Sequence, residues 1–197
     1  DVTTETCSAV EFVSGKYASK DVVVAKCGIG KVFAAICAEA MILKFDVDKI
    51  INIGVAGSLT KDLGVLDVAV ANNVVQHDMD TSPLGDPVGL LSGINMVTLD
   101  ADKDMNALLC DCLSDKGIKF QKGTIATGDQ FVATKEQKDR ITGMFDAIAA
   151  EMEGGSIGHV CYINVPFAIL VLSQTARAEP LIIRHLLRRR QTSLLRL

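Results

Sequence analysis

Ala147-Ile148-Ala149-Ala150-Glu151 is a short apolar run that ends in a carboxylate, and a helical pattern follows it from Gly155 to Tyr162. Such a run is typical of a strand that is buried in an α/β sheet. Apolar runs and helical patterns alternate in the same way along most of the chain. Strands that alternate with helices predict an α/β sandwich, in which helices cover a central sheet.

The hydrophobic patterns on either side of this strand–helix pair predict a β-hairpin near the start of the chain, followed by further strands and helices. The hairpin comprises Val10–Val13 and Val22–Lys26. The further strands span Ile50–Ile53, Val65–Val75, Gly123–Ala126 and Val165–Leu172, and the helices span Val32–Phe45, Ala101–Leu113 and Lys135–Met144.

The composition fits one domain of 197 residues with a substantial core, since 49% of the residues are hydrophobic. No apolar run approaches the roughly 20 residues of a membrane span, and Asp1 to Lys20 carries acids, Ser and Thr where a signal peptide has its apolar segment. The cysteines lack paired metal-ligand spacing, which favours free thiols in a reducing cytoplasm over a metal site. They are Cys7, Cys27, Cys37, Cys110, Cys112 and Cys161.

The basic residues change in type along the chain. Residues 1–170 contain 23 acidic and 14 basic residues, and Arg140 is the single arginine among them. Residues 171–197 contain six arginines and one acidic residue, Glu179. A switch from lysine to arginine at one point favours two different origins for the two pieces over an ordinary domain boundary.

Two stretches contain side chains that suit a nucleoside site, Ala126–Val132 and Ala150–Gly155. Phe131 offers a flat apolar face on which a purine can stack. Glu153 follows the carboxyl end of a predicted strand, where α/β proteins bind ligands, and its carboxylate can accept hydrogen bonds from two ribose hydroxyls. The plainer alternatives are a simple turn at Gly128-Asp129 and a surface carboxylate at Glu153.

Together with Cys27–Val32, Asn52–Leu59 and Ile157–Cys161, these two stretches resemble the bacterial 5'-methylthioadenosine/S-adenosylhomocysteine nucleosidases of the purine nucleoside phosphorylase superfamily. The resemblance runs from about Val10 to Leu170 with all motifs in order. It implies a three-layer α/β/α sandwich with a mixed central sheet, a homodimer, and no metal or other cofactor. The implied reaction is hydrolysis of the N-glycosidic bond of 5'-methylthioadenosine or S-adenosylhomocysteine in methionine salvage, with release of adenine.

The resemblance also assigns roles to individual positions. Ile29 would line the pocket of the 5'-thio substituent, and the backbone of Val55, Ala56 and Gly57 would lie where hydrolases hold water and phosphorylases hold phosphate. The remaining substrate-binding residues would be Phe131 against the purine, the backbone of Val132 at the base edge, Met152 against the ribose and Glu153 at its hydroxyls.

Three other features have plainer interpretations. The turn at Gly28 and Gly30 suits tight packing of a strand on a helix better than a phosphate cradle, because a lone pair of glycines is weak evidence for one. His77 invites a metal site with Asp78 and Asp80, but the resemblance implies that this loop closes a neighbouring subunit's site without metal. His159 is expected to be a packing residue.

Arginine usage favours hydrolysis over phosphorolysis. Phosphate needs fixed cations, normally arginines that make bidentate contacts, and Arg140 lies in a helical pattern where a solvated role fits better. The alternatives that stay open are a purine nucleoside phosphorylase, an AMP nucleosidase, and a non-catalytic module for purine binding or dimerisation.

No catalytic acid or base of the family is retained in this sequence. The family acid is an aspartate in a Ser-Asp pair after the last strand, and its base is a glutamate after an opening strand. We expect this chain to lack that opening strand with its glutamate. Val171 stands at the family's arginine position and Thr175 at its aspartate position.

A shifted reading frame explains the arginine-rich end. When one base precedes a permissible set of codons for Val171–His185, the new frame reads Arg-Ser-Ile-Ser-Asp-Gly-Ala, as the family motif does. Our hypothesis is a single domain over residues 1–170 and a divergent, frameshifted tail over 171–197. The run Leu186–Arg190 could otherwise suggest a nucleic-acid or membrane surface, and we expect neither partner.

Overall fold

The computed structural model describes residues 2–174. A three-stranded antiparallel sheet comes first and a mixed six-stranded sheet with four α-helices follows. The elements, in chain order, are β1 (Thr3–Cys7), β2 (Val10–Tyr17), β3 (Lys20–Ala25), α1 (Lys31–Phe45), β4 (Ile50–Ser58), β5 (Val68–Gln76), the 3-10 turn η1 (Ser82–Leu84), β6 (Thr98–Asp100), α2 (Lys103–Asp115), β7 (Phe120–Thr127), α3 (Lys135–Phe145), β8 (Ala147–Glu151), α4 (Gly154–Tyr162) and β9 (Phe167–Gln174).

The six strands of the central sheet follow the order β6-β5-β7-β8-β4-β9, and an additional pairing of β5 with β9 closes the sheet on itself. β5, β7 and β8 run parallel to one another, as do β4 and β9. β8 pairs with β4, and β5 with β9 and β6, in the antiparallel sense. The predicted mixed sheet is therefore confirmed, and its closure through β9 is a feature that the sequence did not indicate.

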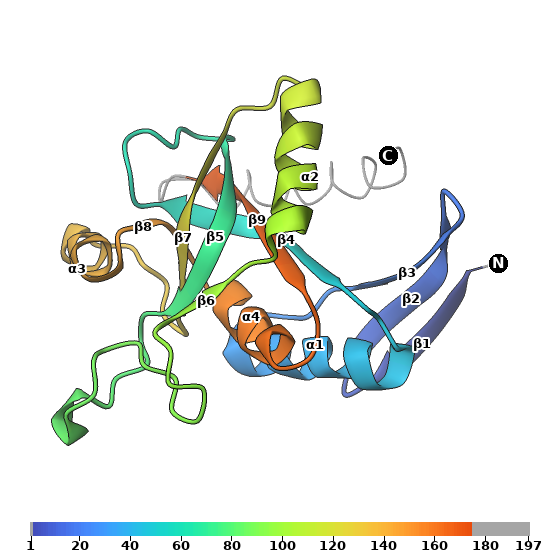
Figure 1. The fold of residues 1–197 in the computed structure, drawn as a ribbon, viewed down its shortest axis with the longest axis horizontal. Coiled ribbons are helices and arrows are strands. Elements are labelled where there is room, and N and C mark those ends of the chain that lie inside the picture. Colours follow the sequence, from blue (N-terminus) through green and yellow to red (C-terminus); the bar gives the residue numbers. More distant parts are fainter. Residues whose placement is uncertain (1, 175–197) are drawn as a thin grey trace.

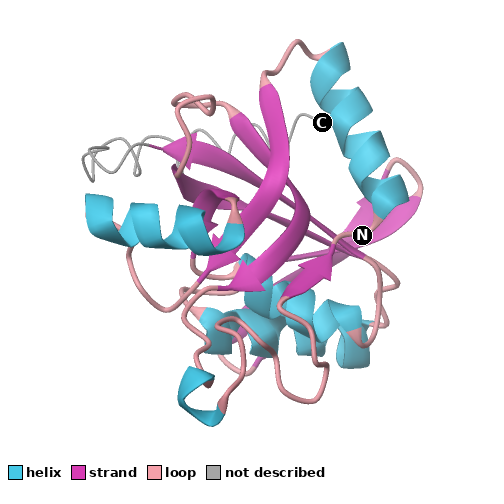
Figure 2. Ribbon diagram, turned by 60° about the vertical axis from the view of Figure 1, so that its left-hand side comes forward, coloured by secondary structure: helices cyan, strands magenta, loops and turns pink. Residues whose placement is uncertain are grey.

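Helices lie on both sides of this sheet (Figures 1 and 2). α1 and α4 pack side by side beneath it, while α2 lies on β5 and β9 and α3 lies on β7 and β8. This arrangement confirms the predicted three-layer α/β/α sandwich. None of the helices within residues 2–174 is long and apolar enough to cross a membrane.

The predicted strands and helices are all present, with shifts at their ends. Two strands were missed for physical reasons: β1 is mostly exposed and polar, so it has no apolar alternation, and β6 has only three residues. β9 extends to Gln174, past the expected domain boundary at residue 170. Val171 is buried in β9, opposite Gly54 of β4 and Ala69 of β5.

Local hydrogen bonds set where two of the helices begin. The Asp102 carboxylate accepts the backbone N–H of Met105 at 2.8 Å and caps α2. Thr134 and Gln137 form a capping box at α3, in which each side chain accepts the other residue's backbone N–H. Satisfying these otherwise unpaired N–H groups stabilises the first turn of each helix.

The main core lies between the central sheet and the helices α1 and α4. It contains Ile125 and Ile169 from the sheet and Ile157 from α4, all buried. A smaller core lies between the three-stranded sheet and α1, where the rings of Phe12 and Phe45 lie 4.7 Å apart. The first sheet is thus anchored to the rest of the domain through α1.

We expect replacement of a core isoleucine to destabilise the fold strongly. Ile169 has 0% of its surface exposed, so Ile169→Ala should lower the free energy of unfolding by about 2–5 kcal/mol through lost burial and the cavity that remains. Urea denaturation measures this. The matched control is Ile163→Ala, since Ile163 is 65% exposed and its replacement should cost less than about 0.5 kcal/mol. Equal losses in the two variants would contradict the described core.

Candidate functional site

The candidate site lies where three parallel strands of the central sheet end together. Gln76 at the end of β5 is opposite Thr127 at the end of β7, and Thr127 is opposite Glu151 at the end of β8. The loops that follow these strands therefore leave the sheet at one edge. They contain His77-Asp78, Gly128–Val132 and Met152-Glu153, and carboxyl ends of parallel strands are where ligands bind in open α/β sheets.

The turn before α1 closes on these loops. The backbone N–H of Gly30 donates to Glu153 Oε1 at 2.8 Å, and that of Lys31 donates to Asp129 Oδ1 at 2.8 Å. Gly30 has φ of 92°, and a Cβ there would lie 2.9 Å from the Asp129 carboxylate, so only glycine fits. Because the turn faces two carboxylates, it is a poor phosphate cradle, and packing is its observed role.

An ion pair completes the connection between α1 and the loop that contains Phe131. Lys31 Nζ lies 2.7 Å from Asp78 Oδ1, and the other Asp78 oxygen accepts the backbone N–H of Asp129 at 2.8 Å. Burial raises the pKa of Asp78, but the hydrogen bonds from Lys31 and from the Asp129 backbone outweigh it and hold that pKa below its ordinary value. Asp78 therefore stays ionised and fixes this loop to α1.

Glu151 is a buried carboxylate directly beneath Glu153. Its Oε2 accepts the backbone N–H of Glu153 at 2.9 Å and of Gly154 at 2.6 Å, and its Oε1 accepts the hydroxyl of Thr127. The pKa of Glu151 is raised to about 7, mainly by burial and also by the charge of Glu153, against the effect of these three donors. This residue was not among the predicted site residues.

Glu153 is half-buried, which is more than a surface carboxylate would be. Burial raises the pKa of Glu153, the Gly30 N–H opposes that shift, and the charge of Asp129 adds to it. A half-buried carboxylate at the edge of a sheet suits hydroxyl groups as ligands, because charge-assisted hydrogen bonds are strong where water is partly excluded.

The structure brings most of the predicted residues to the same edge of the sheet. Ile29 is in the turn that contacts Glu153 and is 76% exposed. Gly57, at the end of β4, lies opposite Ala150 of β8, so the stretch Val55–Gly57 approaches Glu151 from the other side. Met152, which stands between Glu151 and Glu153 in the sequence, is partly buried.

Phe131 and Val132 are on the loop between β7 and α3. Phe131 is 73% exposed, as a stacking platform without its ligand would be, and it follows Asp129, which the Asp78 carboxylate and the Lys31 N–H hold in place. Val132 packs partly buried against the small core that contains Ile141. The expected purine contacts therefore start from an anchored loop.

The two histidines near the site do not form a metal centre in the structure. His77 is buried, burial lowers its pKa, and neither ring nitrogen has a hydrogen-bond partner among residues 2–174. His159 Nδ1 lies 3.3 Å from Gln76 Nε2, in line with the expected packing role. Within the described part of the chain no group of three or more His, Cys, Asp or Glu side chains could hold a metal ion.

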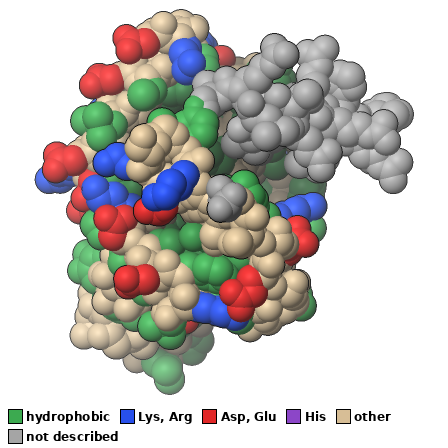
Figure 3. Space-filling model, turned by 90° about the vertical axis from the view of Figure 1, so that its right-hand side faces the viewer, with side chains coloured by type: hydrophobic (Ala, Val, Ile, Leu, Met, Phe, Trp, Pro, Cys, Tyr) green, Lys and Arg blue, Asp and Glu red, His purple; other side chains and the backbone are tan. Residues whose placement is uncertain are grey.

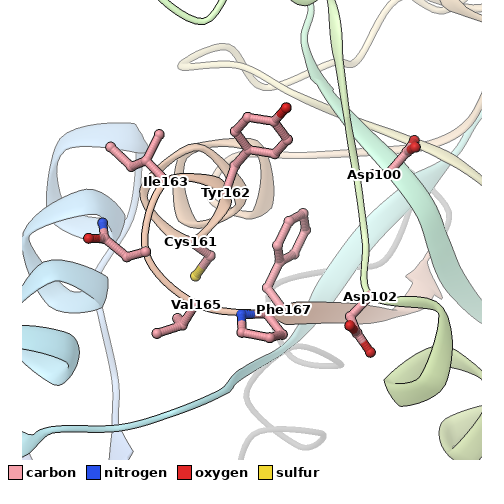
Figure 4. A pocket seen from close by; sticks show the side chains of 9 residues that line it. Asp100, Asp102, Cys161, Tyr162, Ile163, Val165 and Phe167 are labelled. Atoms are coloured by element: carbon pink, nitrogen blue, oxygen red, sulfur yellow. The ribbon is translucent and has the colours of Figure 1, made fainter.

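Two cavities lie away from these residues. One, of about 350 Å³, opens at the far end of α4 from Glu153, where Tyr162 and Phe167 face Asp100 and Asp102 (Figure 4). Its Asp102 is already used as the cap of α2. The other, of about 540 Å³, lies between β5, β7, β8 and α3. We place the candidate site at the strand ends rather than in either cavity, because the loops that contain Phe131 and Glu153 leave the sheet there.

The predicted catalytic positions are only partly within the described residues. Val171 is buried in β9 and has no group that can donate a proton or bind an anion. Thr175 and the rest of the predicted tail, residues 175–197, lie outside the described residues. Arg140 is exposed on α3, as the sequence predicted.

Sequence reasoning missed the residues that hold the site together: Lys31, Asp78, Thr127, Asp129 and Glu151. All of them lie within or beside motifs that were recognised, but only the fold shows that they contact one another. One signal was available for Glu151, because a carboxylate at the end of an otherwise apolar strand is expected to be buried and to need donors.

Comparison with known proteins agrees with this geometry. A family model described as the phosphorylase superfamily matches residues 3–181. An aminodeoxyfutalosine nucleosidase from Helicobacter pylori is 40% identical over 160 residues, which cover 81% of this chain and 69% of the relative. A 5'-methylthioadenosine/S-adenosylhomocysteine nucleosidase from Bacillus subtilis is 34% identical over 180 residues, which cover 89% of this chain and 78% of the relative.

A solved structure gives the same result. The 5'-methylthioadenosine/S-adenosylhomocysteine nucleosidase from Helicobacter pylori with butyl-thio-DADMe-Immucillin-A has a TM-score of 0.86 to this chain at 37% identity, with 89% of this chain and 76% of the other covered. This likeness confirms the predicted nucleoside phosphorylase type of the α/β fold.

The buried Glu151 predicts a specific pH dependence of stability. Its pKa is about 7 in the folded chain and 4.5 ordinarily, so the folded state binds more protons than the unfolded state between these values, and stability falls as the pH rises through them. Glu151→Gln removes this titration. The free energy of unfolding of the wild type should therefore fall relative to the variant between about pH 4.5 and pH 7.

Urea denaturation of both proteins across this pH range measures the difference, and every group that titrates similarly in the two proteins cancels. Parallel stability curves for the two proteins would show that Glu151 has an ordinary pKa.

Proposed function

The chain belongs to the phosphorylase superfamily. From this premise we propose that it hydrolyses the N-glycosidic bond of 5'-methylthioadenosine and of S-adenosylhomocysteine and so releases adenine. By family resemblance it is an N-ribosyl hydrolase. The two substrates and a role in methionine salvage are the parts that we propose.

The observation that carries the proposal is the position of Glu153. Its half-buried carboxylate lies at the end of β8, beside the turn that contains Ile29 and on the same sheet edge as the loop with Phe131. A nucleoside placed here has its ribose hydroxyls at Glu153, its purine on Phe131 and its 5' substituent towards Ile29. Holding the ribose hydroxyls firmly matters because the sugar takes on positive, oxocarbenium-like character as the base leaves.

Water fits this site better than phosphate as the nucleophile. Lys31, at the start of α1, is engaged by Asp78 at 2.7 Å, and Arg140 is exposed on α3. A phosphate would face Asp129, Glu151 and Glu153 without a free bidentate donor from these residues. This argument disfavours both a phosphorylase and an AMP nucleosidase.

A second substrate has one specific observation in its favour. The relative with 40% identity is an aminodeoxyfutalosine nucleosidase, and its name gives aminodeoxyfutalosine as its substrate. The exposed Ile29 leaves the 5' side of the proposed site open, so a bulky 5' group is compatible with it.

We expect the purified chain to release adenine slowly and without phosphate. Val171 and Thr175 replace an arginine and the aspartate that protonates the purine, and loss of a general acid typically costs about 10² to 10⁴ in rate. Liquid chromatography of reactions with 5'-methylthioadenosine, S-adenosylhomocysteine and aminodeoxyfutalosine measures adenine and the sugar product, with and without phosphate.

The Helicobacter pylori relative serves as the active control in this assay, and Phe131→Ala as the variant that should lose adenine affinity. A phosphate-dependent rate with a sugar phosphate as product would mean that the chain is a phosphorylase. Adenine binding without any turnover would favour the non-catalytic alternative, and a rate equal to the control would show that the catalytic positions are misplaced.

We propose a homodimer that forms through α1. This helix has apolar side chains on its outer face as well as its inner one, with Val32 69% and Leu43 73% exposed and with Phe33 and Ile36 partly exposed between them. An apolar stripe of this kind on a surface helix is typical of a face that packs against another chain.

Charged substitutions on this stripe should give a monomer. In Val32→Glu/Leu43→Glu each new carboxylate would have to lose its water at an apolar interface, while both sites are exposed within one chain, so the fold should persist. Sedimentation equilibrium measures the mass. Leu108→Glu on α2 is the matched control, because Leu108 is also exposed. A wild type that is already monomeric, or a control that dissociates equally, would contradict the assignment to α1.

Other partners and the cellular location also stay proposals. On the face shown in Figure 3, acidic and basic side chains are interspersed and do not gather into a patch of one sign. Nucleic-acid binding depends on clustered cations, so we leave nucleic acids out of the proposed partners. The six cysteines have free thiols, which suits the proposed cytoplasmic location.

A further inference from the structure

We propose that Glu151 and Thr127 are positioning residues for the ribose: together they fix the turn that presents Glu153. This inference rests on the proposed function, because it concerns the carboxylate that would bind the ribose hydroxyls. It adds two residues that would touch no substrate and act through Glu153.

The two side chains form a buried hydrogen-bonded unit. Thr127 is 0% exposed and Glu151 is 7% exposed. The Thr127 hydroxyl donates to Glu151 Oε1 and accepts the backbone N–H of Gly155 at 2.6 Å. Glu151 Oε2 accepts the N–H groups of Glu153 and Gly154. Three consecutive backbone donors of the turn are therefore bound by side chains from the ends of β7 and β8.

This unit holds Glu153 from its backbone, while α1 holds it from its carboxylate. The Glu153 N–H lies 2.9 Å from Glu151, and Glu153 Oε1 lies 2.8 Å from the Gly30 N–H. The Glu153 carbonyl also accepts the N–H groups of Ser156 and Ile157 in the first turn of α4. With both ends fixed, the carboxylate points to the sheet edge at a defined place.

An ionised Glu151 matches the groups around it. In this form its two oxygens only accept hydrogen bonds, and all three groups that reach it are donors. An amide in its place would turn its NH₂ group either towards the two backbone N–H donors or towards the Thr127 hydroxyl, which would then have to accept instead of donate. A glycine is favoured at position 155, because a Cβ there would lie 2.8 Å from Thr127 Oγ1, and a Cβ at Gly154 would lie 3.2 Å from Glu151 Oε2, which is a tight contact.

A merely structural role would give a different result from the one we infer. If Glu151 and Thr127 only stabilised the start of α4, their replacement would weaken every ligand alike or none. If they position Glu153, replacement weakens only ligands that have ribose hydroxyls, because adenine needs the loop with Phe131 but not Glu153. The ratio of the two affinities therefore separates the alternatives.

The experiment is calorimetric titration of the full chain with adenine and with formycin A, an adenosine analogue whose base and sugar are joined by a carbon–carbon bond that is not hydrolysed. We expect Glu151→Gln to weaken formycin A binding about 10- to 100-fold. Adenine binding should change less than about threefold.

A second pair of variants keeps the test valid if Glu151→Gln does not fold. Thr127→Val removes the hydroxyl while Glu151 stays, and it should weaken formycin A selectively as well. Thr127→Ser restores the hydroxyl and should recover most of the lost affinity. The matched control is Asn106→Leu, which removes the buried hydrogen bond from Asn106 Nδ2 in α2 to the Ala71 carbonyl in β5 and should lower stability without changing the affinity ratio.

The outcomes separate this inference from the function on which it rests. A wild type that binds neither ligand, or that gains nothing from the sugar, would overturn both. A wild type that prefers formycin A, with variants that lose both ligands equally or neither, would overturn the positioning role alone. Thr127→Ser behaving like Thr127→Val would do the same.

Discussion

The parallel pairing of β5, β7 and β8 is the constraint on which the candidate site depends. Because their last residues lie opposite one another, three loops leave the sheet at a single level. Backbone hydrogen bonds fix this register, and a slip of one residue would turn each side chain to the other face. The register of the sheet therefore brings the loops with Asp78, Asp129 and Glu153 to the same edge.

The start of α1 then joins the three loops to one another. Gly30 and Lys31, adjacent in sequence, provide three donors, and each reaches a carboxylate on a different loop: Glu153, Asp129 and Asp78. The partial positive charge of a helix N-terminus adds to this attraction. Since the local cations and N–H groups are already committed to protein carboxylates, the site has little left with which to bind a phosphate. The same contacts that assemble the site thus argue for water as the nucleophile.

Patterns within short windows were sufficient to predict most of the fold. The strand Ala147–Glu151 and the helix after it have regular apolar spacing, and both lie where the sequence placed them. β1 was missed because an exposed edge strand needs no apolar alternation, and the closure of β5 onto β9 was missed because pairing between distant strands leaves no local signal. Phe131 and Glu153 were predicted from their chemical types and motifs, whereas Lys31 and Asp78 contact each other across 47 positions of the sequence, and the Thr127 partner of Glu151 is 24 positions away.

The two neighbouring glutamates show how burial divides their roles. Glu151 is wholly enclosed, and burial raises its pKa to about 7 in spite of three donors. Glu153 is only half-buried, and one of its donors belongs to α1 rather than to its own turn. Because burial and the charge of Glu153 both raise the pKa of Glu151, a proton on the pair is more easily held by the buried group, and the negative charge is more easily held at the sheet edge. The chain thereby places the more readily ionised carboxylate at the sheet edge and keeps the other inside as the support of the turn.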